Sequence, residues 1–373
     1  MSNEQSKLLL LGIGGGGGRI VAAARASYTG DMRVLCMDTD ALSNREIQQV
    51  ADVPCILFGA KRLAGNGAGG DLTQGRDAFR DESQLLEPHL EGVRTAVIIT
   101  CLGAGTGSGA APEVARVLRG MGIVTLCIAT TPFRFEGKSR QEVADRVRSS
   151  IGSRVNAFAD IHLDDLFAAT GEETVEAANR AADKAIARAV TLLWRVVSRT
   201  GFMCSDPERL HNLIAHGLRT RFDSVAASGD NRAARLTETL KANRILRQSD
   251  GDRARAIFVG ILGGNDLCLA EINGIMKTLR DWYPLADCLT EVATVLDPEL
   301  DGRIELVVFA FESCALADAA AEPPLFDPDN ITRQPKPPKS PKAAKSPPVD
   351  AEVWEGYNLD EPTFRRHRIR LDP

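Results

Sequence analysis

The sequence predicts an α/β fold in which a parallel sheet and a long central helix are followed by a second, smaller α+β domain. Three observations lead to this prediction. Apolar, strand-like runs alternate with helical patterns up to about residue 173, as in a parallel sheet flanked by helices. One long helical pattern follows, from about Thr174 to Arg199. From Asp206 to about Ala317, helical patterns are followed by strand-like ones.

Composition limits the class of protein. An apolar fraction of 44% over 373 residues can fill a buried core, and a net charge of -5 gives no electrostatic reason to bind nucleic acid. We expect no membrane span, because no run reaches the roughly 18 apolar residues that one needs. The eight cysteines show no CxxC spacing, as expected of reduced thiols in the cytoplasm.

The first elements place a glycine run after a strand. Lys7 to Leu11 predicts a buried strand, and Arg19 is expected to open a helix. Between them, Gly12, Gly14 and Gly17 match GxGxxG, and Asp38 follows a second predicted strand at Val34 to Met37. Taken alone, this spacing is typical of a dinucleotide-binding fold, with Asp38 on the ribose. An oxidoreductase therefore stays open as one hypothesis.

A second glycine loop favours another ligand. Gly103, Gly105, Gly107 and Gly109 follow a predicted strand at Ala96 to Thr100, and Pro112 is expected to start the next helix. Glycines let backbone N–H groups approach an anion, so this loop predicts a phosphate cradle. A dinucleotide fold needs no second cradle, and neither run ends in the Gly-Lys-Ser/Thr of a Walker A loop. The pair of loops indicates a nucleotide triphosphate.

These segments, taken in order, resemble the tubulin/FtsZ superfamily of GTPases. GAGTGSG at Gly103 to Gly109 is similar to its GGGTG[ST]G signature, with Ala104 replacing a glycine, and GIGGGGGR at Gly12 to Arg19 is similar to its first loop, where asparagine is usual at Arg19. DTDA at Asp38 to Ala41 and GNGAGGDLTQGR at Gly65 to Arg76 resemble two further motifs. The resemblance implies a Rossmann-like GTPase sheet and covers nearly the whole chain.

The resemblance implies that GTP or GDP is the ligand, together with Mg2+. Asp183, on the central helix, would read the base, since one carboxylate can accept both adjacent donors of guanine. The GTP-binding residues that it implies are Gly15, Gly16, Gly17, Gly18, Arg19, Gly105, Thr106, Gly107, Glu136, Arg140 and Asp183. Two positions near the base depart from the family, because Leu163 replaces an asparagine and Asn179 an aromatic residue. Glu136 and Arg140 also suit a solvated i,i+4 pair.

The segment GFMCSDPERL, Gly201 to Leu210, resembles the family's hydrolytic loop, which acts on GTP held by the next subunit. The candidate catalytic residues are Asp206, Glu208 and Arg209. Asp206 matches the first acid, whereas Cys204 stands in place of an asparagine and Arg209 in place of the second acid. A guanidinium cannot act as a base at neutral pH, so we expect weak hydrolysis. Asp206 before Pro207 also fits a simple helix cap.

The expected domains are a GTP-binding domain at 1–200, an α+β domain at 201–317, a flexible Pro/Lys-rich linker at 318–350 and a tail at 351–373. Within the tail, NLDEPTFRRHRIRLD resembles the FtsZ peptide that binds membrane-tethering division proteins. Leu359, Pro362 and Phe364 would be its apolar anchors. The alternative is a tail that only improves solubility.

Three functional hypotheses follow. The leading one is an FtsZ-like protein that polymerises head to tail for bacterial cell division, in the cytoplasm and at the division site. The second is a non-hydrolysing paralogue that copolymerises with or regulates a conventional FtsZ; Cys204 and Arg209 favour it. The third is the oxidoreductase suggested by the first glycine run.

Overall fold

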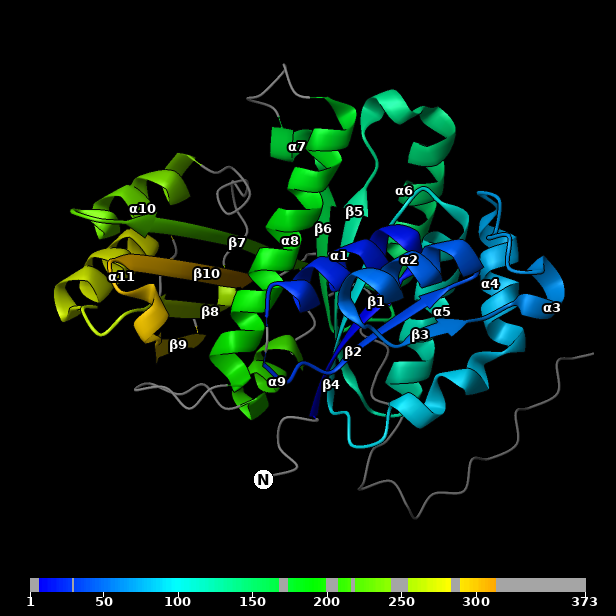
Figure 1. The fold of residues 1–373 in the computed structure, drawn as a ribbon, viewed down its shortest axis with the longest axis horizontal. Helices are drawn as coiled ribbons and strands as arrows, with labels where there is room; N and C mark the ends of the chain where they lie inside the picture. Colours follow the sequence, from blue (N-terminus) through cyan, green and yellow to red (C-terminus); the bar gives the residue numbers. More distant parts are fainter. Residues whose placement is uncertain are drawn as a thin grey trace, which may run out of the picture. The chain divides into compact units, whose positions relative to one another are not determined.

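A computed structural model of the chain describes residues 7–28, 30–167, 174–198, 207–215, 219–242, 254–282 and 289–312. All of them lie in one compact unit, residues 1–321. The described strands form a ten-stranded sheet in the order β3-β2-β1-β4-β5-β6-β7-β10-β8-β9 (Figure 1). They are β1 (Leu8–Ile13), β2 (Val34–Asp38), β3 (Cys55–Leu57), β4 (Thr95–Cys101), β5 (Val124–Thr131), β6 (Ala157–His162), β7 (Arg219–Ser228), β8 (Ala254–Gly263), β9 (Leu289–Leu296) and β10 (Arg303–Glu312).

The pairing confirms the predicted parallel sheet and α+β second half. From β3 to β7 in this spatial order, each strand pairs in parallel with the next one. Strand β10 runs antiparallel to both of its neighbours, β7 and β8. The helices are α1 (Gly14–Ala26), α2 (Ala41–Ala51), α3 (Ala60–Leu63), α4 (Leu72–Asp81), α5 (Gly105–Gly120), α6 (Lys138–Gly152), α7 (Leu163–Phe167), α8 (Val175–Ser198), α9 (Pro207–Ala215), α10 (Arg232–Ala242) and α11 (Leu269–Trp282).

Alternating side chains of the strands feed a core on each face of the sheet. On β1, Leu8 and Leu10 belong to the cluster that packs against α1 and α8, whereas Leu9 and Leu11 belong to the cluster that packs against α5 and α6. This is the period of two expected of a strand that is buried on both faces. A third cluster joins β7, β8 and β10 to α10 and α11.

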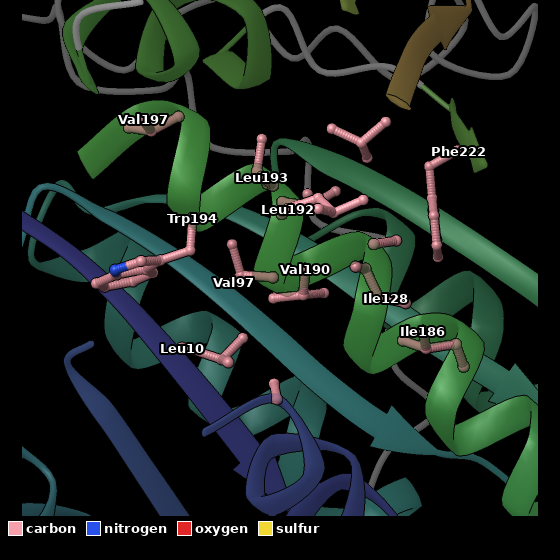
Figure 2. Close-up of a cluster of buried hydrophobic side chains, with 14 of the residues drawn as sticks. Leu10, Val97, Ile128, Ile186, Val190, Leu192, Leu193, Trp194, Val197 and Phe222 are labelled. Atoms are coloured by element: carbon pink, nitrogen blue, oxygen red, sulfur yellow. The ribbon is translucent and has the colours of Figure 1, made fainter. Parts of the chain in front are cut away.

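Helix α8 connects the two halves of the sheet. It contacts α1 on one side and β7, β8 and β10 on the other. Figure 2 shows Ile186, Val190, Leu193 and Trp194 of this helix above strand residues such as Leu10. These side chains are buried, whereas Val175, at the start of the helix, is exposed. No helix in the described part of the chain is long and apolar enough to cross a membrane.

Two helices begin earlier than predicted. We expected Arg19 and Pro112 to open them, but α1 begins at Gly14 and α5 at Gly105, with Pro112 inside the helix. Glycine has a low helix propensity, so the sequence pattern places both runs in loops. Packing reverses that preference, because small residues let each helix start directly against the sheet: a Cβ on Gly17 would lie 2.3 Å from the carbonyl oxygen of Ile99.

Candidate nucleotide-binding site

The N-termini of α1 and α5 open into the same cavity. It has a volume of about 230 Å³ and lies at the carboxyl ends of the neighbouring strands β1 and β4. The residues that line it come from four segments of the chain and are Ile13, Gly14, Gly15, Gly16, Asp38, Asp40, Ser43, Gly67, Ala68, Gly69, Gly70, Cys101, Ala104, Gly105, Thr106 and Gly107. A crevice at the carboxyl ends of parallel strands is the common place for a nucleotide in an α/β sheet.

Neither helix N-terminus is capped by a side chain. Ile13 and Ala104 precede α1 and α5, make no side-chain cap, and no acidic residue lies in either first turn. By contrast, α2 and α4 are capped by Asp40 and Asp71. The first N–H groups of α1 and α5 have no partner within their helices, and both helix dipoles present their positive ends to the cavity. The arrangement suits a polyanion such as a triphosphate.

Close packing against β4 excludes a side chain at Gly107, on the cavity wall. A Cβ on Gly107 would lie 2.7 Å from Oγ1 of Thr100 and 2.8 Å from the carbonyl oxygen of Cys101. Because the carbonyl belongs to the strand backbone, it cannot move aside without disturbing β4. A side chain at position 107 would therefore strain β4, and Gly107 lines the cavity without one.

The predicted phosphate residues divide into two groups. Gly15, Gly16, Gly105, Thr106 and Gly107 line the cavity. Gly17 and Gly18 do not line it; Gly17 faces β4, and Gly18 lies against Ile47 of α2. The hydroxyls of Thr106 and Thr39 are 2.6 Å apart and join the second glycine turn to the segment after β2.

Some cavity residues were missing from the predicted GTP-binding set. Asp38 accepts hydrogen bonds from the backbone N–H groups of Thr39 and Asp40, and burial raises the pKa of its carboxyl. The loop Gly67–Gly70 is held against this turn, since Gly67 N–H donates to the carbonyl of Thr39 over 3.1 Å. The sequence carried a signal for both, because DTDA and GNGAGGDLTQGR resemble family motifs. We gave neither segment a role in GTP binding, and Asp38 had a role, on the ribose, only in the dinucleotide hypothesis.

Arg19 and Asp183 form an ion pair beside the cavity. Nε of Arg19 donates to Oδ2 of Asp183 over 3.2 Å; the Asp183 side chain is 18% exposed and that of Arg19 59%. Burial raises the pKa of Asp183, and the neighbouring guanidinium opposes that rise. The other end of the Arg19 guanidinium lies toward the first glycine turn, 3.9 Å from the position of a Cβ on Gly16. Arg19 thus connects the phosphate end of the site to the carboxylate predicted to read the base.

The two substituted base positions lie near Asp183 in sequence or space. Leu163 is buried with Phe133 and Ala182, the residue before Asp183. Asn179 is half-buried and donates from Nδ2 to the carbonyl of Val175. Neither side chain offers an aromatic ring for stacking.

Glu136 and Arg140 lie against the second glycine turn from the other side. They are hydrogen-bonded to each other, and Glu136 also accepts from the N–H of Phe133 over 2.9 Å. A Cβ on Gly103 would lie 3.1 Å from the carbonyl oxygen of Arg140. The pair predicted from i,i+4 spacing therefore exists, and it stands next to the cradle.

The described candidates for hydrolysis lie at the opposite rim of the sheet. Glu208 lies in the first turn of α9 and accepts from Arg94, just before β4, over 2.6 Å, with Nζ of Lys7 at 3.8 Å. Arg209 pairs with Glu291 of β9 at 3.1 Å. Cys204 and Asp206 lie outside the described residues, and so do the predicted tail anchors Leu359, Pro362 and Phe364.

Comparison with known proteins identifies the family. Residues 7–169 match the model of the tubulin/FtsZ family GTPase domain, and residues 224–312 match the FtsZ family C-terminal domain. The chain is 28% identical over 367 residues to "Cell division protein FtsZ" of Pseudomonas aeruginosa, covering 98% of this chain and 90% of that protein. It is 27% identical over 370 residues to the protein of the same name from Coxiella burnetii, with the same coverage.

Solved structures share the fold. An empty FtsZ dimer of M. jannaschii matches with a TM-score of 0.75 at 22% identity, over 82% of this chain and 88% of that one. A GTPγS-bound protofilament of CetZ2 from Haloferax volcanii matches with a TM-score of 0.68 at 20% identity, over 84% and 96%. The first glycine run thus belongs to a tubulin-type domain and not to a dinucleotide oxidoreductase. Since the two family models together match about two thirds of the 373 residues, the chain belongs to the tubulin/FtsZ family of GTPases.

Proposed function

We propose that the protein binds GTP between α1 and α5 and assembles head to tail into filaments that act in bacterial cell division, in the cytoplasm and at the division site. One observation carries the proposal: the uncapped helix N-termini and the residues of α9 lie on opposite rims of the same parallel sheet. The names of the FtsZ relatives support the role in division.

The cavity at the carboxyl rim of one molecule can meet α9, at the amino rim, only from a second molecule. The cavity adjoins Ile13 and Cys101, at the ends of β1 and β4, whereas Glu208 contacts Lys7 and Arg94, just before these strands begin. One chain cannot bring α9 to its own cavity. A second copy stacked in the same orientation places its α9 rim against the cavity of the first. Such a heterologous interface, repeated without closing, builds a filament.

Hydrolysis across this interface is weak in our proposal. Arg209 stands where the family places an acid, and its guanidinium cannot accept a proton from water. Glu208, one position earlier, is already paired with Arg94 and Lys7 of its own chain. Asp206 is the remaining candidate, and we propose that it acts without the usual second acid.

The residues present suit a magnesium ion that arrives with the triphosphate. Among the described residues, no three His, Cys, Asp or Glu side chains form a metal-binding group. Asp38 and Asp40 line the cavity, and magnesium commonly takes one or two carboxylates together with phosphate oxygens and water. The ion would neutralise phosphate charge. We further propose that Leu359, Pro362 and Phe364 bind a membrane-tethering division protein.

The test is GTP-dependent sedimentation and phosphate release of the purified full chain with magnesium. We expect filaments with GTP and slow release of phosphate. Arg209→Asp restores the second acid and should raise turnover at least about tenfold, since a positioned general base typically contributes about 10²- to 10⁴-fold. Arg146→Asp makes the same charge change at an exposed position of α6 and should leave turnover unchanged.

The outcomes separate the two family hypotheses. Assembly only in the presence of a conventional FtsZ, with no phosphate release from the native chain or from Arg209→Asp, would favour the regulatory paralogue. In such a paralogue Arg209 would keep its pair with Glu291 and take no part in hydrolysis. A chain that binds no guanine nucleotide and stays monomeric with GTP and magnesium, both with and without a conventional FtsZ, contradicts the proposal.

A further inference from the structure

Two cysteines stand side by side at the edge of the sheet, apart from the nucleotide cavity lining. Cys36 of β2 and Cys55 of β3 are register partners in adjacent parallel strands. Backbone hydrogen bonds hold this register on both sides, from Cys36 N–H to the carbonyl of Pro54 (2.9 Å) and from Phe58 N–H to the carbonyl of Asp38 (3.1 Å). Both cysteines are free thiols.

The spacing of the two strands suits a covalent link. Side chains of register partners point to the same face of a sheet, and neighbouring strands are about 4.8 Å apart. That separation falls inside the Cα–Cα range of disulfides, about 4.4 to 6.8 Å. Because β3 has three residues and forms an edge of the described sheet, it can shift slightly to complete the S–S geometry.

The environments of the two thiols differ in a way that assigns them separate roles. Cys36 is buried and its Sγ lies 3.9 Å from the carbonyl oxygen of Gly18, whereas Cys55 is half-buried and reachable from solvent. The thiol of Cys55 donates to the carbonyl of Val53 over 3.3 Å, within its own segment. Cys55 is therefore the more accessible of the two thiols and the one that a solvent oxidant reaches first.

We propose that Cys36 and Cys55 form a dithiol modification site that peroxides oxidise to an intramolecular disulfide. The Cys55 thiolate attacks a peroxide oxygen, the O–O bond breaks, and a sulfenic acid and hydroxide form. Sγ of Cys36 then attacks the sulfenic sulfur, the S–O bond breaks, and the leaving hydroxide takes the Cys36 proton. Two thiols lose two electrons in total, and hydrogen peroxide becomes two molecules of water.

The link should be reversible. Exposed disulfides are more easily reduced than buried ones, and Cys55, on the edge strand β3, is only half-buried. Cys127 provides the internal comparison, since it is also a buried strand cysteine, yet its register partners are Ile98 and Phe158 and not a second cysteine.

Trypsin makes the test direct. Cleavage after Arg33, Arg45 and Lys61 places Cys36 and Cys55 on consecutive peptides, 34–45 and 46–61, that contain no other cysteine. The full-length chain is treated with hydrogen peroxide, alkylated and analysed by mass spectrometry. We expect a linked pair of these peptides, with the loss of two hydrogen atoms, that a dithiol reductant separates. The link should persist in Cys127→Ser and disappear in Cys55→Ser.

A trivalent arsenical gives a second measurement that needs no oxidation, because it bridges two neighbouring thiols. One adduct is expected on the native chain and on Cys127→Ser, and none at this site in Cys55→Ser. If the peptides stay unlinked although exposed Cys268 is oxidised, or if Cys55 links to other cysteines as often as to Cys36, the proposal is wrong.

Discussion

The two rims of the parallel sheet use different kinds of residue: glycines at the carboxyl rim and charged side chains at the amino rim. At the carboxyl rim, glycines of the turns at α1 and α5 line the cavity, and a side chain at Gly107 is excluded by its contact with the Cys101 carbonyl. At the amino rim, α9 is held by half-exposed ion pairs of Lys7, Arg94 and Glu208. A side chain added in the glycine turns would collide with strand backbone, whereas a substitution in α9 would replace a partly solvated charge.

This difference explains where the chain departs from its family resemblance. The glycines of both turns are present, and Ala104 replaces a glycine outside the helix, in extended conformation. The departures fall on groups that act through side chains: Arg19, Leu163 and Asn179 near the base, and Cys204 and Arg209 in the hydrolytic segment. A backbone cradle tolerates few alternatives, while side-chain chemistry can be replaced one residue at a time.

The largest effect is expected from Gly107→Ala. Its Cβ would overlap backbone atoms of β4, and such overpacking typically costs about 1 to 3 kcal/mol. We expect lower stability and a loss of GTP affinity of about tenfold or more. Gly120→Ala, at the other end of α5, places its Cβ in open space and should be neutral or stabilise by up to about 1 kcal/mol. Denaturant unfolding and nucleotide titration measure both; equal behaviour would contradict the steric cradle.

Asp183→Asn is next in size. It keeps the shape of the side chain but removes a charged acceptor, and hydrogen bonds to charged groups are worth about 1.5 to 3 kcal/mol. GTP affinity should fall by about 10- to 100-fold. Comparing GTP with ITP, which lacks the exocyclic amine of guanine, tests the assignment: the native chain should prefer GTP and the variant should not. An unchanged preference would mean that another residue reads the base.

Arg19→Asn should act mainly through pH. At neutral pH we expect less than a fivefold change, since exposed ion pairs contribute about 0 to 1 kcal/mol. Burial raises the pKa of Asp183 and Arg19 opposes the rise, so removal of the guanidinium raises that pKa further. The carboxylate must be ionised to accept from guanine; therefore, as pH falls, the variant should lose GTP at a higher pH than the native chain. Titrations between about pH 4 and 8 start near the ordinary aspartate pKa of about 3.9 and follow any rise above it, and coincident profiles would refute the coupling.

Glu208→Gln should have the smallest effect. Its pairs with Arg94 and Lys7 are partly exposed, so we expect a stability change below about 1 kcal/mol and unchanged phosphate release. A drop in release of tenfold or more would show that Glu208 acts as the missing acid after all, and that the amino rim is as specialised as the cradle.

Much of the site could be predicted from the sequence. The glycine runs indicated two phosphate-type loops, and the family resemblance implied Gly15, Gly16, Gly105, Thr106 and Gly107, all of which line the cavity. Gly17 and Gly18 were included because runs of one residue type give no positional information. Only packing shows that Gly17 faces β4 and Gly18 faces α2. The Asp38 turn was visible as a motif, but its place on the cavity wall depends on four separate segments meeting.

The sequence by itself determined the parallel sheet, the long helix α8 and the presence of two anion-binding turns, because hydrophobic period and glycine spacing act over short stretches of chain. Only the tertiary structure decided that α1 and α5 begin inside the glycine runs, that Arg19 pairs with Asp183, and that Cys36 meets Cys55. These outcomes depend on contacts between residues far apart in sequence, such as the 164 positions that separate Arg19 from Asp183. Local sequence propensity does not reflect such contacts. The free energy of burial and close packing outweighs it where the two disagree.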